Sequence, residues 1–186
     1  MRLYALCDQE LLDLKGISVE EFVIIAKQNG AEIIQYRNKT ADITFIKQQL
    51  IKIRKMYDGF LIVNDAYELI EFCDGVHLGQ EDLKLIDSDI QNAVKIVRAV
   101  ITKEKILGIS THNIEEVLQA NACDLNYIGL GAYRNTNTKE VSTILGDTLD
   151  SIASQSKHFV AAIGGVKKSD SFTHVTYHVI GSGLVS

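Results

Sequence analysis

Two apolar runs in the chain stop at acidic or amide side chains, which are the first candidates for chemistry. The run LIV leads into Asn64 and Asp65, and the run VHLG leads into Gln80, Glu81 and Asp82. Short apolar runs without alternation are typical of strands buried on both faces, and parallel sheets carry their chemistry at the carboxyl ends of such strands. Neighbouring strands lie roughly 4.8 Å apart. Asp65 and Asp82 could therefore converge on one hard cation such as Mg²⁺.

A pair of cations follows another strand-like run. Gln35 and Tyr36 lead into Arg37 and Lys39. Guanidinium and ammonium groups suit the oxygens of a diphosphate that bridges to a metal ion. The same cations and the acidic tips could instead form a solvated salt-bridge cluster. Their placement favours a binding site, because the loops at the carboxyl ends of barrel strands build the active site.

Later strand ends add hydroxyl groups and a lysine. Ser110 follows a strand-like run and could face the same mouth. A polar segment further along carries Thr136, Thr138 and Lys139, which suit oxyanions and could close over a substrate. His112 is either a proton shuttle or a hydrogen-bonded structural histidine.

Glycines mark the ends of the last two strand-like runs. The first of these runs ends at Gly164 and Gly165, and the second leads from Ile180 into Gly181 and Ser182. Glycine allows backbone N–H groups to approach a ligand closely, although it also serves tight turns. The loops after the last two strands of such barrels usually bind phosphate. The mouth therefore offers a diphosphate site and, facing it, a monophosphate site.

The elements that position these residues alternate along the whole chain. Eight strand-like runs recur, at residues 2–7, 32–36, 60–64, 75–78, 106–109, 126–130, 159–163 and 178–180. Apolar spacing near 3.6 predicts helices at residues 19–28, 43–56, 90–100, 114–120 and 143–153, and residues 66–72 have room for about two helical turns. Eight β/α units predict a closed TIM (β/α)8 barrel, although a doubly wound open sheet shares the local pattern.

This barrel is expected to be trimmed at its C-terminal end. Only residues 166–177 separate the last two strand-like runs, and a typical barrel has roughly 250 residues. The side of the barrel that this leaves uncovered could be buried by a second subunit, so a homodimer is a possible partner state.

Composition and charge exclude several classes of protein. The 186 residues are 46% hydrophobic, which predicts one folded domain over residues 1–186. A net charge of −5 argues against nucleic-acid or membrane surfaces as general partners. No apolar run approaches a membrane span, so we expect a cytoplasmic location. Cys7, Cys73 and Cys123 lack metal-binding spacing and are expected to be small buried hydrophobes.

Six short motifs, in order, resemble the thiamine phosphate synthase family. They are QYRNK (35–39), LIVND (61–65), GVHLGQEDL (75–83), GIST (108–111), TNTK (136–139) and AIGG (162–165). The resemblance implies a TIM barrel that joins hydroxymethylpyrimidine diphosphate to a thiazole phosphate and releases diphosphate with Mg²⁺. Departure of diphosphate would leave a pyrimidine-stabilised cation, which the thiazole nitrogen captures. No covalent nucleophile is required, and we expect no paired nucleophile and base at the mouth.

The resemblance also implies a role for each matching residue. The residues implied for the pyrimidine diphosphate are Gln35, Arg37, Lys39, Asn64, Ser110 and Lys139, of which Arg37, Lys39, Ser110 and Lys139 are implied in catalysis. Asp65 and Asp82 are implied as ligands of Mg²⁺. The residues implied for the thiazole phosphate are Thr136, Thr138, Gly165, Ile180, Gly181 and Ser182.

Two other functions stay open. The related thiazole tautomerase shares the barrel and the monophosphate cup but tends to lose the cations and metal carboxylates, and it can use a histidine near the fifth strand, a position that His112 matches. This chain departs from the synthase pattern at Asn38 and over residues 134–136. Retention of the cations and acids nevertheless favours the synthase. The third function is that of a non-catalytic regulatory barrel that binds phosphate.

Overall fold

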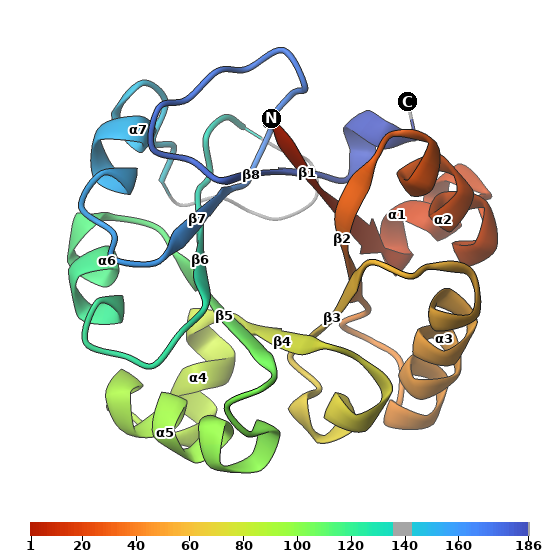
Figure 1. Ribbon diagram of the computed structural model, residues 1–186, viewed down its shortest axis with the longest axis horizontal. Helices are drawn as coiled ribbons and strands as arrows, with labels where there is room; N and C mark the ends of the chain where they lie inside the picture. The colour runs from red at the N-terminus through yellow and green to blue at the C-terminus, as the bar shows by residue number, and fades with distance from the viewer. Residues whose placement is uncertain (136–142, 186) are drawn as a thin grey trace.

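Eight parallel strands close into a barrel in the computed structural model, which confirms the predicted TIM-barrel architecture (Figure 1). The structure describes residues 1–135 and 143–185. The strands are β1 (Arg2–Asp8), β2 (Ala31–Arg37), β3 (Phe60–Asn64), β4 (Gly75–Leu78), β5 (Ile106–Thr111), β6 (Tyr127–Leu130), β7 (Phe159–Ala162) and β8 (Tyr177–Ile180). Each strand pairs with the next one along the chain, and β8 pairs with β1. The doubly wound open sheet is therefore excluded.

Two apolar clusters hold the barrel together. The larger one lies between the strands and the surrounding helices, and it includes fully buried Phe22, Leu50 and Ile128. The smaller one fills the barrel and includes Tyr4 and Tyr127. Because the strands are covered on both faces, their sequences are apolar without alternation, as the sequence pattern predicted.

Helices surround the strands on the outside (Figure 1). They are α1 (Gln9–Lys15), α2 (Val19–Gln28), α3 (Ile43–Met56), α4 (Gln80–Ile86), α5 (Ile90–Ile101), α6 (Ile114–Ala120) and α7 (Thr148–Ala153), with 3₁₀ turns η1 (Tyr67–Phe72) and η2 (Ser182–Leu184). Side-chain caps explain where several of the helices begin. Ser18 and Glu21 form a capping box at α2, and Asp42 caps α3. The two turns of η1 occupy the short crossover predicted between β3 and β4.

Three helices differ from the sequence-based expectation. Helices α1 and α4 were not predicted, because each follows its strand without an intervening loop. The polar cluster Gln80 to Asp82 is thus the first turn of α4 rather than a loop. Helix α7 begins at Thr148 and not at Thr143, after a turn at Gly146 whose φ is +51°.

The connection from β7 to β8 contains no helix, although all of its residues, 163–176, are described. In Figure 1 it runs as a long loop on the side of β8 and β1, where the ring of helices is open. Val166 is buried, and Phe172 and Val175 pack against the core, so this loop covers the barrel wall in place of a helix. Within the part of the chain that the structure describes, no helix is long and apolar enough to cross a membrane.

Candidate active site

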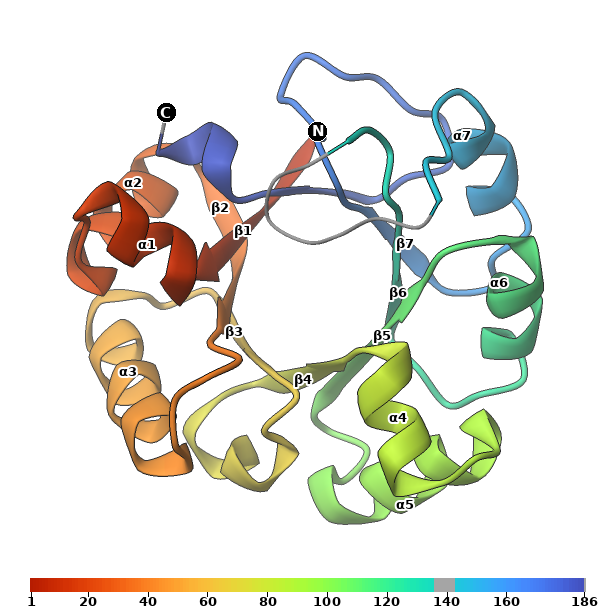
Figure 2. The same cartoon turned by 180° about the vertical axis from the view of Figure 1, so that it is seen from behind.

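The carboxyl ends of the strands form the mouth of the barrel, which Figure 2 shows with α1 and α4 at its rim. Both helices follow their strands directly, so the side chains at these strand ends are held by regular structure on both sides. This placement suits catalytic groups, which must be positioned by rigid elements.

Lys39 joins the two carboxylates that were predicted to converge. Its ammonium Nζ donates to Asp65 Oδ2 at 2.5 Å and to Asp82 Oδ2 at 3.2 Å. Lys39 lies two residues beyond β2, Asp65 follows β3 and Asp82 lies in the first turn of α4. The three side chains are 44%, 22% and 28% exposed, so the cluster is open to a ligand from the mouth. The two carboxylates therefore lie close together, on one ammonium group.

The backbone around Asp65 is shaped to present its carboxylate. Asp65 has a φ of +63°, a left-handed conformation that aspartate tolerates better than most side chains. Its own N–H donates to the carbonyl of His77 at 2.9 Å, which ties the end of β3 to β4. A Cβ atom at Gly79 would lie 2.7 Å from Asp82 Oδ2. A side chain at this position would therefore push the Asp82 carboxylate out of its place.

Burial and neighbouring charges have opposite effects on the pKa values of Asp65 and Lys39. Burial raises the pKa of Asp65, and the Asp82 carboxylate adds to this effect, so the pKa stays raised although the Lys39 ammonium lowers it. Burial alone would lower the pKa of Lys39, but its hydrogen bonds and charge interactions with both carboxylates raise it. Lys39 therefore remains a cation at neutral pH.

Arg37 is separate from this cluster. Its guanidinium forms an ion pair with Asp8 at the end of β1, and the Asp8 carboxylate is only 2% exposed. Asp8 also accepts a hydrogen bond from the N–H of Leu11 and so caps α1. Asp8 was missed in the sequence, although an acidic residue directly after the run LYALC carried the same signal as Asp65.

The remaining residues implied for the pyrimidine diphosphate lie on neighbouring strands. Gln35 on β2 donates from Nε2 to Asn64 Oδ1 on β3 at 2.8 Å, and Asn64 Nδ2 donates to Asp65 Oδ2 at 2.5 Å. Ser110 on β5 is hydrogen-bonded through Oγ to His77 Nε2 at 3.0 Å. Ser110 and His77 therefore form a hydroxyl–imidazole pair across β5 and β4, which the sequence analysis did not anticipate.

The residues implied for the thiazole phosphate are only partly described. Gly164 and Gly165 adopt φ values of +84° and +66°, and a Cβ on Gly165 would lie 2.8 Å from the Cβ of Arg134. The side chain of Ile180 is buried in the core, so only its backbone is available to a ligand. Gly181 and exposed Ser182 follow it at the start of η2. Thr136, Thr138 and Lys139 lie outside the described residues.

His112 contacts a helix. Its Nδ1 is hydrogen-bonded to Glu116 Oε2 at 2.9 Å, and its backbone N–H donates to the same oxygen at 2.7 Å. Asn113 caps the same helix, α6. These contacts match the structural interpretation of His112. They hold its Nδ1 against Glu116 on α6, which is not one of the site residues described above.

The donor set fits a magnesium ion that also binds a substrate. Over residues 1–135 and 143–185, no group of three or more histidine, cysteine or acidic side chains could hold a metal ion. Mg²⁺ does not need such a cage, because it is commonly held by one or two carboxylates together with waters and substrate phosphates. Asp65 and Asp82 converge on one ammonium group, so they already face a common cationic position.

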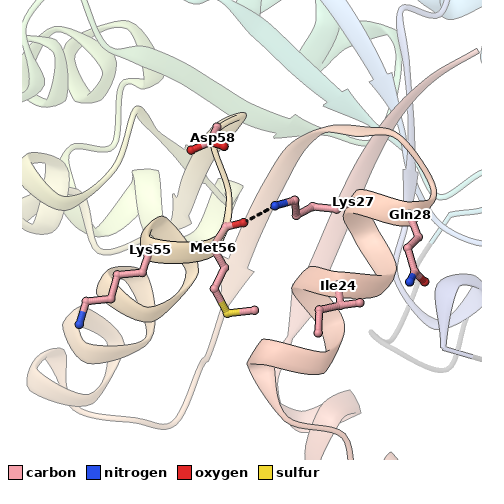
Figure 3. Close-up of a pocket in the computed structure, with 6 residues that line it drawn as sticks. All are labelled: Ile24, Lys27, Gln28, Lys55, Met56 and Asp58. Atoms are coloured by element: carbon pink, nitrogen blue, oxygen red, sulfur yellow. Dashed lines mark hydrogen bonds between the residues drawn. The ribbon is translucent and has the colours of Figure 1, made fainter.

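A surface hollow elsewhere is unrelated to these groups. It has a volume of about 470 Å³ and lies between the ends of α2 and α3 (Figure 3). Lys27 Nζ donates to the carbonyl of Met56 across it at 2.7 Å. Both helices lead from there into the amino ends of β2 and β3, so the hollow lies at the rim opposite to the mouth.

Comparison with known proteins identifies the family. The model of the family described as thiamine monophosphate synthase matches residues 3–185. Thiamine-phosphate synthase from Persephonella marina is 34% identical over 176 residues, which cover 91% of this chain and 79% of the relative. The Clostridium acetobutylicum enzyme of the same name is 30% identical over 193 residues, covering 100% of this chain and 85% of the relative.

A solved structure agrees with the sequence relatives. Thiamine phosphate pyrophosphorylase from Pyrococcus furiosus superposes with a TM-score of 0.78 and 27% identity, over 97% of this chain and 85% of that protein. This chain belongs to the thiamine monophosphate synthase family.

Proposed function

We propose that the chain condenses hydroxymethylpyrimidine diphosphate with a thiazole phosphate to give thiamine phosphate and diphosphate. The observation that carries this proposal is the cluster of Lys39, Asp65 and Asp82 at the mouth of the barrel. One cation between two carboxylates suits a polyphosphate leaving group that arrives with a divalent ion. A monophosphate site alone would need neither carboxylate, which disfavours the tautomerase.

The cations and the amides hold the diphosphate substrate. Lys39 and Arg37 would neutralise the charge that develops on the departing diphosphate, and Lys139 is proposed to assist them. Gln35 and Asn64 would orient the pyrimidine ring through the donors and acceptors that their amides still have free. Ser110 would contact the same substrate from β5.

The metal and the second substrate complete the proposed site. Asp65 and Asp82 would hold Mg²⁺, which when bound would offset the charge of the diphosphate oxygens. Thr136, Thr138, Gly165 and Ser182 are proposed to bind the thiazole phosphate, with the backbones of Ile180 and Gly181. The barrel thereby positions the thiazole nitrogen to capture the pyrimidine-stabilised cation, without a covalent enzyme intermediate. A cytoplasmic location stays a prediction.

The test is release of diphosphate from both substrates and Mg²⁺, with thiamine phosphate followed in parallel. We expect equal amounts of the two products from the wild-type protein. Asp65→Asn and Asp82→Asn should each lower the rate by roughly a hundredfold, because each removes a charge that faces the metal. Glu81→Gln is the matched control, because Glu81 is the exposed neighbour of Asp82 on α4.

Two results would contradict the proposal. Unchanged synthesis in either asparagine variant would overturn the metal assignment. Failure of the folded wild-type protein to release diphosphate would overturn the proposed reaction itself.

A further inference from the structure

A line of buried polar side chains crosses the inside of the barrel below the mouth. Consecutive strands from β1 to β6 each contribute one member: Tyr4, Gln35, Asn64, His77, Ser110 and Tyr127. Tyr4, Gln35, His77 and Tyr127 are between 1% and 7% exposed. Polar groups at this depth need hydrogen-bond partners, so their arrangement has energetic consequences.

The six side chains and Asp65 form one continuous series of hydrogen bonds, which we call the barrel relay. Its links are Ser110 Oγ to His77 Nε2 (3.0 Å), His77 Nδ1 to Tyr127 OH (2.9 Å), Tyr127 OH to Tyr4 OH (2.8 Å), Tyr4 OH to Gln35 Oε1 (2.9 Å), Gln35 Nε2 to Asn64 Oδ1 (2.8 Å) and Asn64 Nδ2 to Asp65 Oδ2 (2.5 Å).

Glycines on the neighbouring strands make room for the rings of the relay. A Cβ atom at Gly108 would lie 2.2 Å from the Tyr127 ring, and one at Gly129 would lie 3.0 Å from the His77 ring. The His77 and Tyr127 rings stack at a centroid distance of 5.5 Å. The ring positions are therefore determined by the strand sequences and do not depend on a ligand.

The Asp65 end sets the direction of the first links. A carboxylate only accepts hydrogen bonds, so Asn64 must turn its NH₂ group toward Asp65. The Asn64 carbonyl then accepts from Gln35 Nε2, which leaves the Gln35 carbonyl to accept from the hydroxyl of Tyr4. Turning either amide around would place two oxygens against each other.

The remaining links follow from the single proton on each phenol. Because Tyr4 donates its proton to Gln35, its oxygen accepts from Tyr127. The oxygen of Tyr127 must then accept from His77, which requires the hydrogen on Nδ1. Burial raises the pKa of both tyrosines, so both phenols keep their protons at neutral pH. A neutral imidazole with hydrogen on Nδ1 has a bare Nε2, which accepts from the hydroxyl of Ser110.

We infer that the barrel relay holds His77 as its Nδ1–H tautomer and makes Ser110 Oγ a hydrogen-bond acceptor toward the mouth. Tyr4, Tyr127 and His77 are positioning residues in this inference, which rests on the proposed function for the identity of the ligand. Ser110 then receives a hydrogen bond from an N–H group of the heteroaromatic substrate. It does not donate to a phosphate oxygen.

The relay differs from a nucleophile activated by a catalytic triad. In such a triad, a buried carboxylate faces Nδ1 and stabilises the imidazolium that forms when the serine loses its proton. Here a neutral phenol, Tyr127, faces Nδ1 of His77. The arrangement orients Ser110 without supplying that charge, in agreement with a reaction that needs no covalent intermediate.

The tautomer of His77 can be measured without substrates, by long-range ¹H–¹⁵N NMR of the full chain, with the signals assigned by comparison with His77→Gln. We expect hydrogen on Nδ1 in the wild-type protein. In Tyr127→Phe, Nδ1 loses its acceptor, so the hydrogen should move to Nε2. In Tyr4→Phe, the Tyr127 hydroxyl is released to donate to Nδ1, so the tautomer should change in the same way although Tyr4 does not touch His77.

A kinetic measurement on the same variants tests the role of Ser110. Both phenylalanine variants should lower kcat/KM for the pyrimidine diphosphate by roughly tenfold, the loss expected for one hydrogen bond. The KM for the thiazole phosphate should stay within twofold. Tyr177→Phe is the matched control, because Tyr177 packs edge-on against Tyr4 inside the same barrel at 6.4 Å but is outside the relay.

The outcomes separate the relay from the proposed function. Hydrogen on Nε2 in the wild-type protein, or an unchanged tautomer in Tyr4→Phe, would overturn the relay. The expected tautomers with kinetics equal to those of Tyr177→Phe would overturn the substrate contact of Ser110. A wild-type protein that makes no thiamine phosphate would refute the proposed function, while the NMR result would still decide on the relay.

Discussion

Lys39 is the side chain on which the predicted metal carboxylates converge, and its two ion pairs make a specific prediction. Replacement by alanine removes the cation nearest to the proposed diphosphate. We expect Lys39→Ala to weaken binding of the pyrimidine diphosphate in the presence of Mg²⁺ by tenfold or more, because hydrogen bonds between charged groups contribute about 1.5–3 kcal/mol. Binding of the thiazole phosphate should change by less than twofold. Isothermal titration calorimetry with each substrate measures both.

Lys55→Ala provides the control for charge. Lys55 lines the hollow at the opposite rim, so its loss changes the net charge equally without altering the mouth. Equal losses of affinity for the two substrates in Lys39→Ala would mean that the mouth is not divided into two anion sites.

Single residues at strand ends were predictable from the sequence, whereas residues inside the barrel were not. Asp65, Asp82 and Lys39 stood out because each lies within a few residues of the end of an apolar run. Tyr4 and Tyr127 lie within such runs. A strand buried on both faces has no polar alternation, so its sequence does not show which residues point into the barrel. Only strand register brings the two hydroxyls to 2.8 Å from each other.

Helices were likewise only partly predictable from the sequence. The predicted helices at residues 19–28, 43–56 and 114–120 have the observed bounds, because caps and apolar spacing agree there. Helices α1 and α4 are no shorter than α6, but each follows its strand without an intervening loop, so its pattern merges with that of the strand. They are held by contacts with the barrel, and α1 also by the Asp8 cap and by Gly16 at a φ of +65°.

An ion pair between Arg134 and Asp170 anchors the first half of the connection from β7 to β8. The guanidinium of Arg134 donates to both carboxylate oxygens of Asp170, at 2.6 and 2.8 Å, and to the carbonyl of Gly165 at 2.9 Å. Asp170 also accepts from the N–H of Lys167 at 2.8 Å. Arg134 lies in the loop after β6. Its hydrogen bonds, which we call the Arg134 fork, therefore join two loops at the proposed monophosphate site.

We therefore expect Asp170→Asn to loosen this connection. Cleavage within residues 163–176 by a protease at low concentration should become faster, because an amide cannot accept both hydrogen bonds of the guanidinium. The affinity for the thiazole phosphate should fall more than that for the pyrimidine diphosphate. Asp124→Asn is a matched control, because the exposed Asp124 carboxylate pairs with Arg98 on α5 and not with this connection. Cleavage at the wild-type rate would show that the Arg134 fork does not hold the connection.

At the scale of the whole molecule, the barrel is closed but its ring of helices is not (Figure 1). The connection over β8 buries Val166 and exposes Lys167 and Lys168, so its apolar side already faces the core. A second subunit is thus not required to cover this wall, and the homodimer stays a prediction. Beneath this connection, the barrel wall contains the ionisable side chain of His178 on β8.

His178 makes the stability of the molecule depend on pH. Its side chain is buried, and its Nδ1 has no hydrogen-bond partner among the residues that the structure describes. Burial lowers the pKa of His178, so the folded protein keeps it neutral where the unfolded chain, with a pKa near its ordinary value of about 6.5, takes up a proton. The unfolded state then binds more protons, and the free energy of unfolding falls as the pH falls below that value.

Replacement of His178 by phenylalanine should remove this part of the pH dependence. The ring would still pack edge-on against Phe172, whose centroid lies 5.2 Å away, but it could not take up a proton. Urea unfolding at pH 7.5, 6.5 and 5.5 measures the difference, and we expect the wild-type protein to lose more stability than His178→Phe between the first and last of these. Asp150 and Asp170 do not affect this comparison. Their pKa values are lowered in the folded protein, so their contribution to the free energy of unfolding is lost only as the pH falls below about 4. Parallel curves for the two proteins would show that His178 titrates alike in the folded and unfolded states.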